Sequence, residues 1–135
     1  MKQNKPTNMK KIFLICMISL GCYSIAHTQQ TEQEVRKLLM HKWKITGMDL
    51  DGRTIPMPEE MTEFFTFKAN NIFIDNSDGK DSKGKWTYNH KTKTITTTED
   101  GDVQLHKIVK LTGTDLVVTA KTDEGMSNLL LKRAD

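Results

Sequence analysis

Four histidines are the residues of this chain best suited to holding a metal ion. They lie at separated positions: His27, His41, His90 and His106. A histidine metal site usually shows a recognisable ligand spacing, such as two histidines four residues apart on one helix face. No such spacing occurs here, so we interpret these side chains as surface imidazoles and predict no metal site.

The acidic residues offer little for catalysis. The stretch "DNSDGKDS" at residues 75–82 lacks the alternating ligands and distal glutamate of an EF-hand, and its composition indicates a solvated hairpin. Glu59 and Glu60 are adjacent in a predicted loop, where carboxylates are usually solvated. The sequence has no Gly-x-Ser-x-Gly elbow and no phosphate-binding glycine loop. We therefore predict a protein that is not an enzyme and needs no cofactor.

The first 26 residues have the three-part pattern of a secretory signal peptide. Four basic residues come first: Lys2, Lys5, Lys10 and Lys11. An apolar run begins at Ile12 and is too short to span a bilayer as a stable helix. We predict that residues 1–26 are a signal peptide and that residues 27–135 form one domain.

Two processing routes fit this segment. Residues 24–26 form the small-x-small pattern that precedes cleavage after Ala26, and this route, which we favour, gives a periplasmic or secreted protein. Alternatively, "SLGC" resembles a lipobox in which Cys22 is acylated and anchors the chain to the cell envelope, with Ser19 where a lipobox usually has an apolar residue. Cys16 and Cys22 both lie in this segment, so the domain has no cysteine for a disulfide or a nucleophile.

The charge balance of the domain argues against nucleic acid as a partner. The chain carries 20 Lys and Arg and 17 Asp and Glu. All four charged residues before residue 27 are basic, so 16 basic residues oppose 17 acidic residues in the domain. Nucleic-acid binding usually needs a strongly basic face, which this balance does not predict.

The domain is expected to begin with a short helix and to continue in strands. Thr31 and Glu34 have capping-box spacing, and Val35, Leu38 and Leu39 follow in one apolar stripe. From residue 42 onward, apolar residues alternate with a period of two, which predicts strands with one buried face. We expect about eight strands, near 42–49, 62–68, 71–75, 84–88, 93–98, 104–111, 115–121 and 126–133.

Turn residues separate these predicted strands. Asp-Gly pairs at 51–52, 78–79 and 100–101 are typical of tight hairpins. The alternation slips between Ile108 and Leu111, which predicts a β-bulge. Consecutive hairpins favour a barrel, because closure removes exposed sheet edges. The predicted fold is therefore all-β: an antiparallel up-and-down barrel of about eight strands, preceded by a short N-terminal helix.

The order of these motifs resembles a known family. A helix leading into "KWKI", then "FTFKANNIF", "GKWTY", "HKIVKLTGTDLVV" and "LLLKR", is similar to the small exported bacterial lipocalin-like domains of the calycin group, over residues 37–133. In lipocalins, a tryptophan on the first strand is covered by an arginine from the last strand at the closed end. The resemblance implies that Trp43 and Arg133 form this structural closure, with His41 at the position of the family's glycine.

The resemblance also implies a small apolar or amphipathic ligand at the open end of the barrel. An eight-stranded barrel holds either a side-chain core or one small ligand. The predicted lining, beneath a loop at 50–61, comprises Phe65, Phe67, Phe73, Trp86, Tyr88, Leu116 and Val118. Truncating one buried aromatic side chain costs about 3–5 kcal/mol, whereas a domain is stable by about 5–15 kcal/mol. We therefore expect a mostly filled interior with a shallow pocket at the mouth.

A second hypothesis comes from a different functional class. The protein would be an interaction or inhibitor module at the cell envelope, with a filled barrel and loops that contact a partner. A measurable cavity would favour the ligand-binding hypothesis, and a contiguous exposed apolar patch would favour this one.

Overall fold

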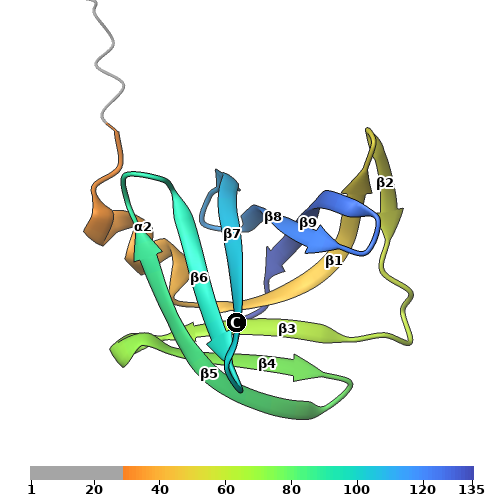
Figure 1. The fold of residues 1–135 in the computed structure, drawn as a ribbon, viewed down its shortest axis with the longest axis horizontal. Helices are drawn as coiled ribbons and strands as arrows, with labels where there is room; N and C mark the ends of the chain where they lie inside the picture. The colour runs from red at the N-terminus through yellow and green to blue at the C-terminus, as the bar shows by residue number, and fades with distance from the viewer. Residues whose placement is uncertain (1–28) are drawn as a thin grey trace, which may run out of the picture.

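The computed structural model describes residues 29–135, which contain one α-helix and nine strands (Figure 1). The predicted signal peptide and Cys22 lie outside the described residues. No helix in the described part of the chain is long and apolar enough to cross a membrane. The elements are α2 (Glu32–Leu39), β1 (Lys42–Leu50), β2 (Arg53–Pro56), β3 (Glu63–Lys68), the 3-10 turn η1 (Ala69–Asn71), β4 (Ile72–Ser77), β5 (Lys80–Asn89), β6 (Thr94–Glu99), β7 (Asp102–Leu111), β8 (Asp115–Thr122) and β9 (Gly125–Arg133).

Eight of the strands close into an antiparallel up-and-down barrel. From β3 to β9 each strand pairs with the next along the chain, and β1 pairs with β3. β9 then returns to β1 through pairs that run from Trp43 with Arg133 to Asp49 with Asn128. The predicted fold class is therefore confirmed.

Strand β2 is not one of the eight barrel strands and pairs with the part of β1 that lies beyond its pairing with β3. Residues 42–44 of β1 pair with β3, whereas residues 47–50 pair with β2. A Cβ on Gly47 would lie 2.9 Å from the carbonyl oxygen of Ile55, so this close approach requires glycine. The sequence predicts a loop at 50–61, and it misses β2 because all four residues of the strand are exposed and carry no alternating burial pattern.

Helix α2 covers one end of the barrel, which we call the closed end (Figure 1). The predicted capping box is present: the Glu34 amide donates to Thr31 Oγ1 at 3.2 Å, and the Thr31 amide donates to Glu34 Oε2 at 2.7 Å. These two bonds satisfy amides that have no partner within the helix. Val35 and Leu39 are the buried residues of the helix and join the core of the barrel.

Trp43 joins the helix to the barrel at the closed end. Its side chain is 0% exposed, and its Nε1 donates to the Leu39 carbonyl oxygen at 3.0 Å. That carbonyl belongs to the last turn of α2, where backbone acceptors need partners from outside the helix. The indole therefore contributes both apolar burial and a hydrogen bond to the seal.

Aromatic side chains fill the closed half of the barrel. Trp86 is 1% exposed, and its Nε1 donates to the Lys68 carbonyl oxygen at 2.9 Å. The Phe67 ring lies 5.3 Å from the rings of both Trp86 and Phe73, measured between centroids. From outside, the Arg36 guanidinium lies 4.8 Å from the centroid of the Trp86 ring. This half of the interior is a packed core.

The Trp43→Ala variant tests the seal at the closed end. Truncation removes one of the two fully buried indoles of the described residues and the bond to Leu39, so we expect the free energy of unfolding to fall by about 3–5 kcal/mol. Guanidinium denaturation followed by circular dichroism measures this loss. Ile55→Ala, on exposed β2, is the control and should change stability little, and equal stabilities of the two variants would contradict the seal.

Candidate functional site

The inner face of the barrel changes from apolar to polar toward the open end, opposite α2. Two residues beyond the core position Phe73, β4 places Asp75 on the inner face. By the same two-residue spacing, Glu63 lies on the inner face of β3 and Glu99 on that of β6. All three carboxylates are partly buried, so the open half of the lumen is acidic.

Phe65 and His106 separate the two halves of the lumen. Their strands, β3 and β7, are not neighbours in the sheet, yet the two ring centroids lie 6.4 Å apart. Phe65 also makes an edge contact with Phe73 in the packed core, at 5.4 Å between centroids. These two rings therefore form the floor of the open half.

β7 and β8 separate above this floor. Their pairing extends from Leu111 with Leu116 to Ile108 with Val118, with a register shift between Ile108 and Lys110. This shift confirms the predicted β-bulge. Toward the open end, β7 continues to pair with β6 but has no further partner on β8, so the wall of the barrel is open there.

Side-chain hydrogen bonds join β7 to β8 where the pairing stops. His106 Nδ1 donates to the Thr119 carbonyl oxygen at 2.9 Å, and the Lys107 amide donates to Thr119 Oγ1 at 2.9 Å. Because a carbonyl oxygen only accepts, the proton of a neutral His106 is on Nδ1 and Nε2 is an acceptor. Burial lowers the pKa of His106 below its usual value and so favours this neutral form.

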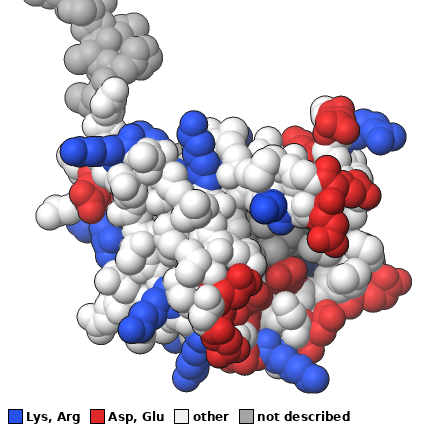
Figure 2. Space-filling model, viewed as in Figure 1, with Lys and Arg blue, Asp and Glu red and all other residues white. Residues whose placement is uncertain are grey.

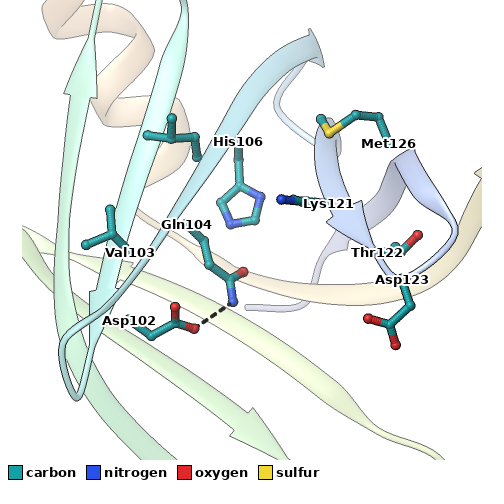
Figure 3. A pocket seen from close by; sticks show the side chains of 9 residues that line it. Asp102, Val103, Gln104, His106, Lys121, Thr122, Asp123 and Met126 are labelled. Carbon is teal, nitrogen blue, oxygen red and sulfur yellow. Dashed lines mark hydrogen bonds between the residues drawn. The ribbon is translucent and has the colours of Figure 1, made fainter.

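The gap between β7 and the β8–β9 hairpin contains a cavity of about 600 Å³. Figure 2 shows a hollow on this face of the molecule, with acidic side chains around it. The polar and apolar groups that line the cavity include Asp102, Gln104, His106, Lys121, Asp123 and Met126 (Figure 3). Cavities of roughly 300–1,000 Å³ hold small molecules.

In the acidic part of the site, burial and neighbouring negative charges both raise the pKa values of carboxyl groups. Burial raises the pKa of the Glu63 carboxyl, and the charge of Asp75 raises it further. Burial also raises the pKa of Asp75, with a second contribution from the charge of Glu99. The ionised forms of these groups are therefore disfavoured in the folded protein. Such perturbed pKa values are typical of functional sites.

The family comparison supports this description of the fold. A family model described as a lipocalin-like domain matches residues 39–118. The chain belongs to the lipocalin-like domain family. Comparisons with curated proteins and with solved structures find no match for this chain. The matched range of the lipocalin-like domain includes both floor residues, Phe65 and His106.

In this lipocalin-like domain, the two predicted closure residues are neighbours but do not stack. Trp43 pairs with Arg133 across β1 and β9. Arg133 Nε donates to Asp135 Oδ1 at 2.9 Å, and this bond lowers the pKa of the Asp135 carboxyl to about 2. Among residues 29–135, the cation–π contact with an indole is that of Arg36 with Trp86, so the guanidinium of Arg133 is held by a carboxylate and not by Trp43.

The seven predicted lining residues lie at different depths. Six are buried in the packed core of the lipocalin-like barrel: Phe67, Phe73, Trp86, Tyr88, Leu116 and Val118. Phe65 is partly buried and packs against this core from the floor of the open half. A ligand contact for these residues stays a prediction, and Phe65 is the member of the set that borders the open half.

The interpretation of His106 as a surface imidazole is wrong. The side chain is 5% exposed and lies on the inner face of β7, whereas His41 and His90 are partly exposed and His27 lies outside the described residues. The alternation in "QLHKIVKL" places His106 and Ile108 on one face, but its polar neighbours hide that signal. Within residues 29–135, no group of three or more His, Cys, Asp or Glu is arranged to hold a metal ion.

The sequence does not identify the polar residues of the site. Its pattern predicts a solvated hairpin around Asp75 and gives no role to Glu63, Glu99, Gln104 and Lys121. Inward polar residues at the open end break the apolar alternation by which inward positions are recognised. In the sequence, the charge of these residues therefore predicts that their side chains are solvated.

The Asp75→Asn variant tests the repulsion in the open half. It removes one of the mutually repelling charges, so we expect the melting temperature at pH 7 to rise by about 2–4 °C, the shift that ~0.5 kcal/mol produces in a domain of this size. Because the pKa of Asp75 is raised in the folded state, the gain should be largest at neutral pH. It should disappear as the pH falls below the ordinary carboxyl pKa, where Asp75 is protonated in both states.

Differential scanning fluorimetry between pH 3 and pH 8 measures this difference. Asp51→Asn, in the exposed turn between β1 and β2, is the matched control and should show no such gain. A wild-type protein that is more stable than Asp75→Asn at pH 7 would contradict the repulsion.

Proposed function

We propose that this chain is an exported, non-enzymatic lipocalin-like domain that binds one small amphipathic molecule at the open end of its barrel. The observation that carries the proposal is the cavity of about 600 Å³ beside Gln104 and His106, above a packed core. Its wall combines charged groups with the apolar side chains of Val103 and Met126. A molecule with both polar and apolar parts complements this wall better than a pure hydrocarbon does, because buried polar groups need partners.

The non-enzymatic assignment is supported by the family and by the chemistry of the cavity. Lipocalin-like domains are generally non-enzymatic, and their fold is generally associated with small hydrophobic ligands. His106, the imidazole of the cavity wall, uses Nδ1 to bond the backbone of Thr119. Among the described residues, no hydroxyl or thiol nucleophile is hydrogen-bonded to this imidazole. The arrangement therefore fits ligand binding better than nucleophilic catalysis.

Export is supported by the N-terminal segment. Residues 1–26 combine basic residues, an apolar run and a small-x-small sequence at residues 24–26. Cleavage after Ala26 produces a periplasmic or secreted domain. Acylation of Cys22 is the alternative and would tether the same domain to the cell envelope.

The Gln104→Trp variant tests ligand binding at the open end. The larger side chain projects from the cavity wall, so we expect it to weaken binding of N-phenyl-1-naphthylamine, a neutral fluorescent apolar probe, by about tenfold or more. Gln33→Trp is the matched control, because Gln33 is exposed on α2 at the closed end. Fluorescence titration of both variants and the wild type gives the three dissociation constants.

Equal probe affinity in the two variants would place the bound probe elsewhere on the surface. A wild-type domain that is folded, as judged by circular dichroism, but does not bind the probe would contradict the proposal itself.

One observation favours a second candidate function, that of a protein-interaction module. β7 exposes three apolar side chains, of which the first two also border the cavity: Val103 is 57% exposed, Leu105 62% and Val109 56%. Exposed apolar side chains gathered on one strand are typical of contact surfaces for other proteins. The same fluorescence titration distinguishes the two functions. A folded barrel that does not bind N-phenyl-1-naphthylamine favours the interaction module.

A further inference from the structure

Charge is segregated between the two ends of the barrel. Of the 17 Asp and Glu in the chain, those at the closed end are Glu32, Glu34, Asp115 and Asp135. All the other acidic residues lie in the open half. In Figure 2 the acidic side chains gather around the hollow, and the part of this face on the left, toward α2, carries mainly basic side chains. The open end therefore has a negative field, which attracts cations.

The acidic surface continues from the cavity into the lumen. Asp102, in the cavity wall, pairs with Glu99 across β6 and β7. A Cβ on Gly84 of β5 would clash with the Thr98 carbonyl oxygen and would also lie only 2.8 Å from Glu99 Cγ. This glycine thus leaves room for the Glu99 side chain, whose charge acts on Asp75. One series of carboxylates therefore extends from the cavity wall to β4.

Two buried polar side chains on the inner face have unused hydrogen-bonding capacity. His106 is 5% exposed and bonds Thr119 through Nδ1, which leaves Nε2 as an acceptor. Its imidazole points into the cavity, between Gln104 and the Lys121 amine (Figure 3). Ser127, on the inner face of β9, is also 5% exposed, and its Oγ has no partner among the described residues. Of the two, Ser127 Oγ is the buried atom without a partner, and such atoms are rare in folded proteins.

We propose that the open end selects amphipathic molecules that carry a protonated amine head group. The ammonium donates an N–H to His106 Nε2 within the negative field of the carboxylates at the open end, and the apolar part lies along Met126. This inference rests on the proposed function. It extends that function by naming the chemical class of the ligand.

Lys121 is the basic residue in the cavity wall, and its positive charge repels a cationic head group. Its side chain is exposed, and its flexible stem lets the ammonium move into solvent when a cationic ligand enters. The Lys121→Met variant keeps an unbranched apolar chain but removes the charge. We therefore expect it to bind cationic amphiphiles several-fold more tightly than the wild type.

A series of ligands with one tail and different head groups tests the inference. Calorimetric titration of the domain, below the critical micelle concentrations, compares dodecylammonium, dodecyltrimethylammonium, dodecanol and dodecanoate at pH 7. We expect dodecylammonium to bind at least about tenfold more tightly than dodecanol, a ratio that one charge-assisted hydrogen bond supplies. Dodecyltrimethylammonium has no N–H donor and should lie between them, and dodecanoate should be the weakest. Added salt should reduce these ratios.

Variants that remove one carboxylate charge show which end of the barrel produces the preference for dodecylammonium. Glu99→Gln should reduce the preference for dodecylammonium several-fold, whereas Glu32→Gln, a matched change at the closed end, should leave it unchanged. Equal binding of the alcohol and the amine, or tighter binding of dodecanoate, would overturn the amine selectivity and leave the proposed function intact. A folded domain that binds none of the four ligands would overturn both.

Discussion

The hydrogen bond from His106 to the Thr119 carbonyl holds the barrel wall together at the point where β7 and β8 separate. On one side of this bond the strands are paired and the interior is packed. On the other side the wall is open and a cavity lies between β7 and the β8–β9 hairpin. The bond also determines the chemistry of the site, because it occupies Nδ1 and leaves Nε2 as an acceptor inside the cavity. One contact therefore serves the closure of the fold and, in the proposed function, the recognition of a ligand.

The two halves of the lumen differ in packing and in charge. In the closed half, Trp43 and Trp86 bury their rings and satisfy both indole N–H groups with backbone carbonyls, as a stabilising core requires. In the open half, carboxylates face one another and burial disfavours their charges. Nothing in the fold requires this repulsion, and natural proteins usually tolerate such local conflicts where a site has a function. The packed half offsets the electrostatic cost of the open half.

The elements that depend on local or periodic signals could be predicted from the sequence. The Thr31 and Glu34 capping box marks the start of α2, and the period-two pattern marks the eight strands that close the barrel. β2 could not be predicted, because its exposed residues have no alternation. The site could not be predicted either, because inward polar residues such as Asp75 and His106 hide the alternation that would place them, and the cavity follows from the separation of β7 and β8. That separation depends on pairing between distant parts of the chain, which residue types alone do not reveal.

The most direct measurement is the tautomeric state of His106 in solution. Long-range ¹H–¹⁵N correlation spectra of the ¹⁵N-labelled domain at pH 7 distinguish the two neutral tautomers and the imidazolium by their nitrogen shifts. With His106→Gln to assign the signals, the structure predicts a neutral ring that is protonated on Nδ1 and has an unprotonated Nε2. A proton on Nε2 alone would contradict both the bond to Thr119 and the acceptor in the cavity, and an imidazolium at this pH would contradict the acceptor.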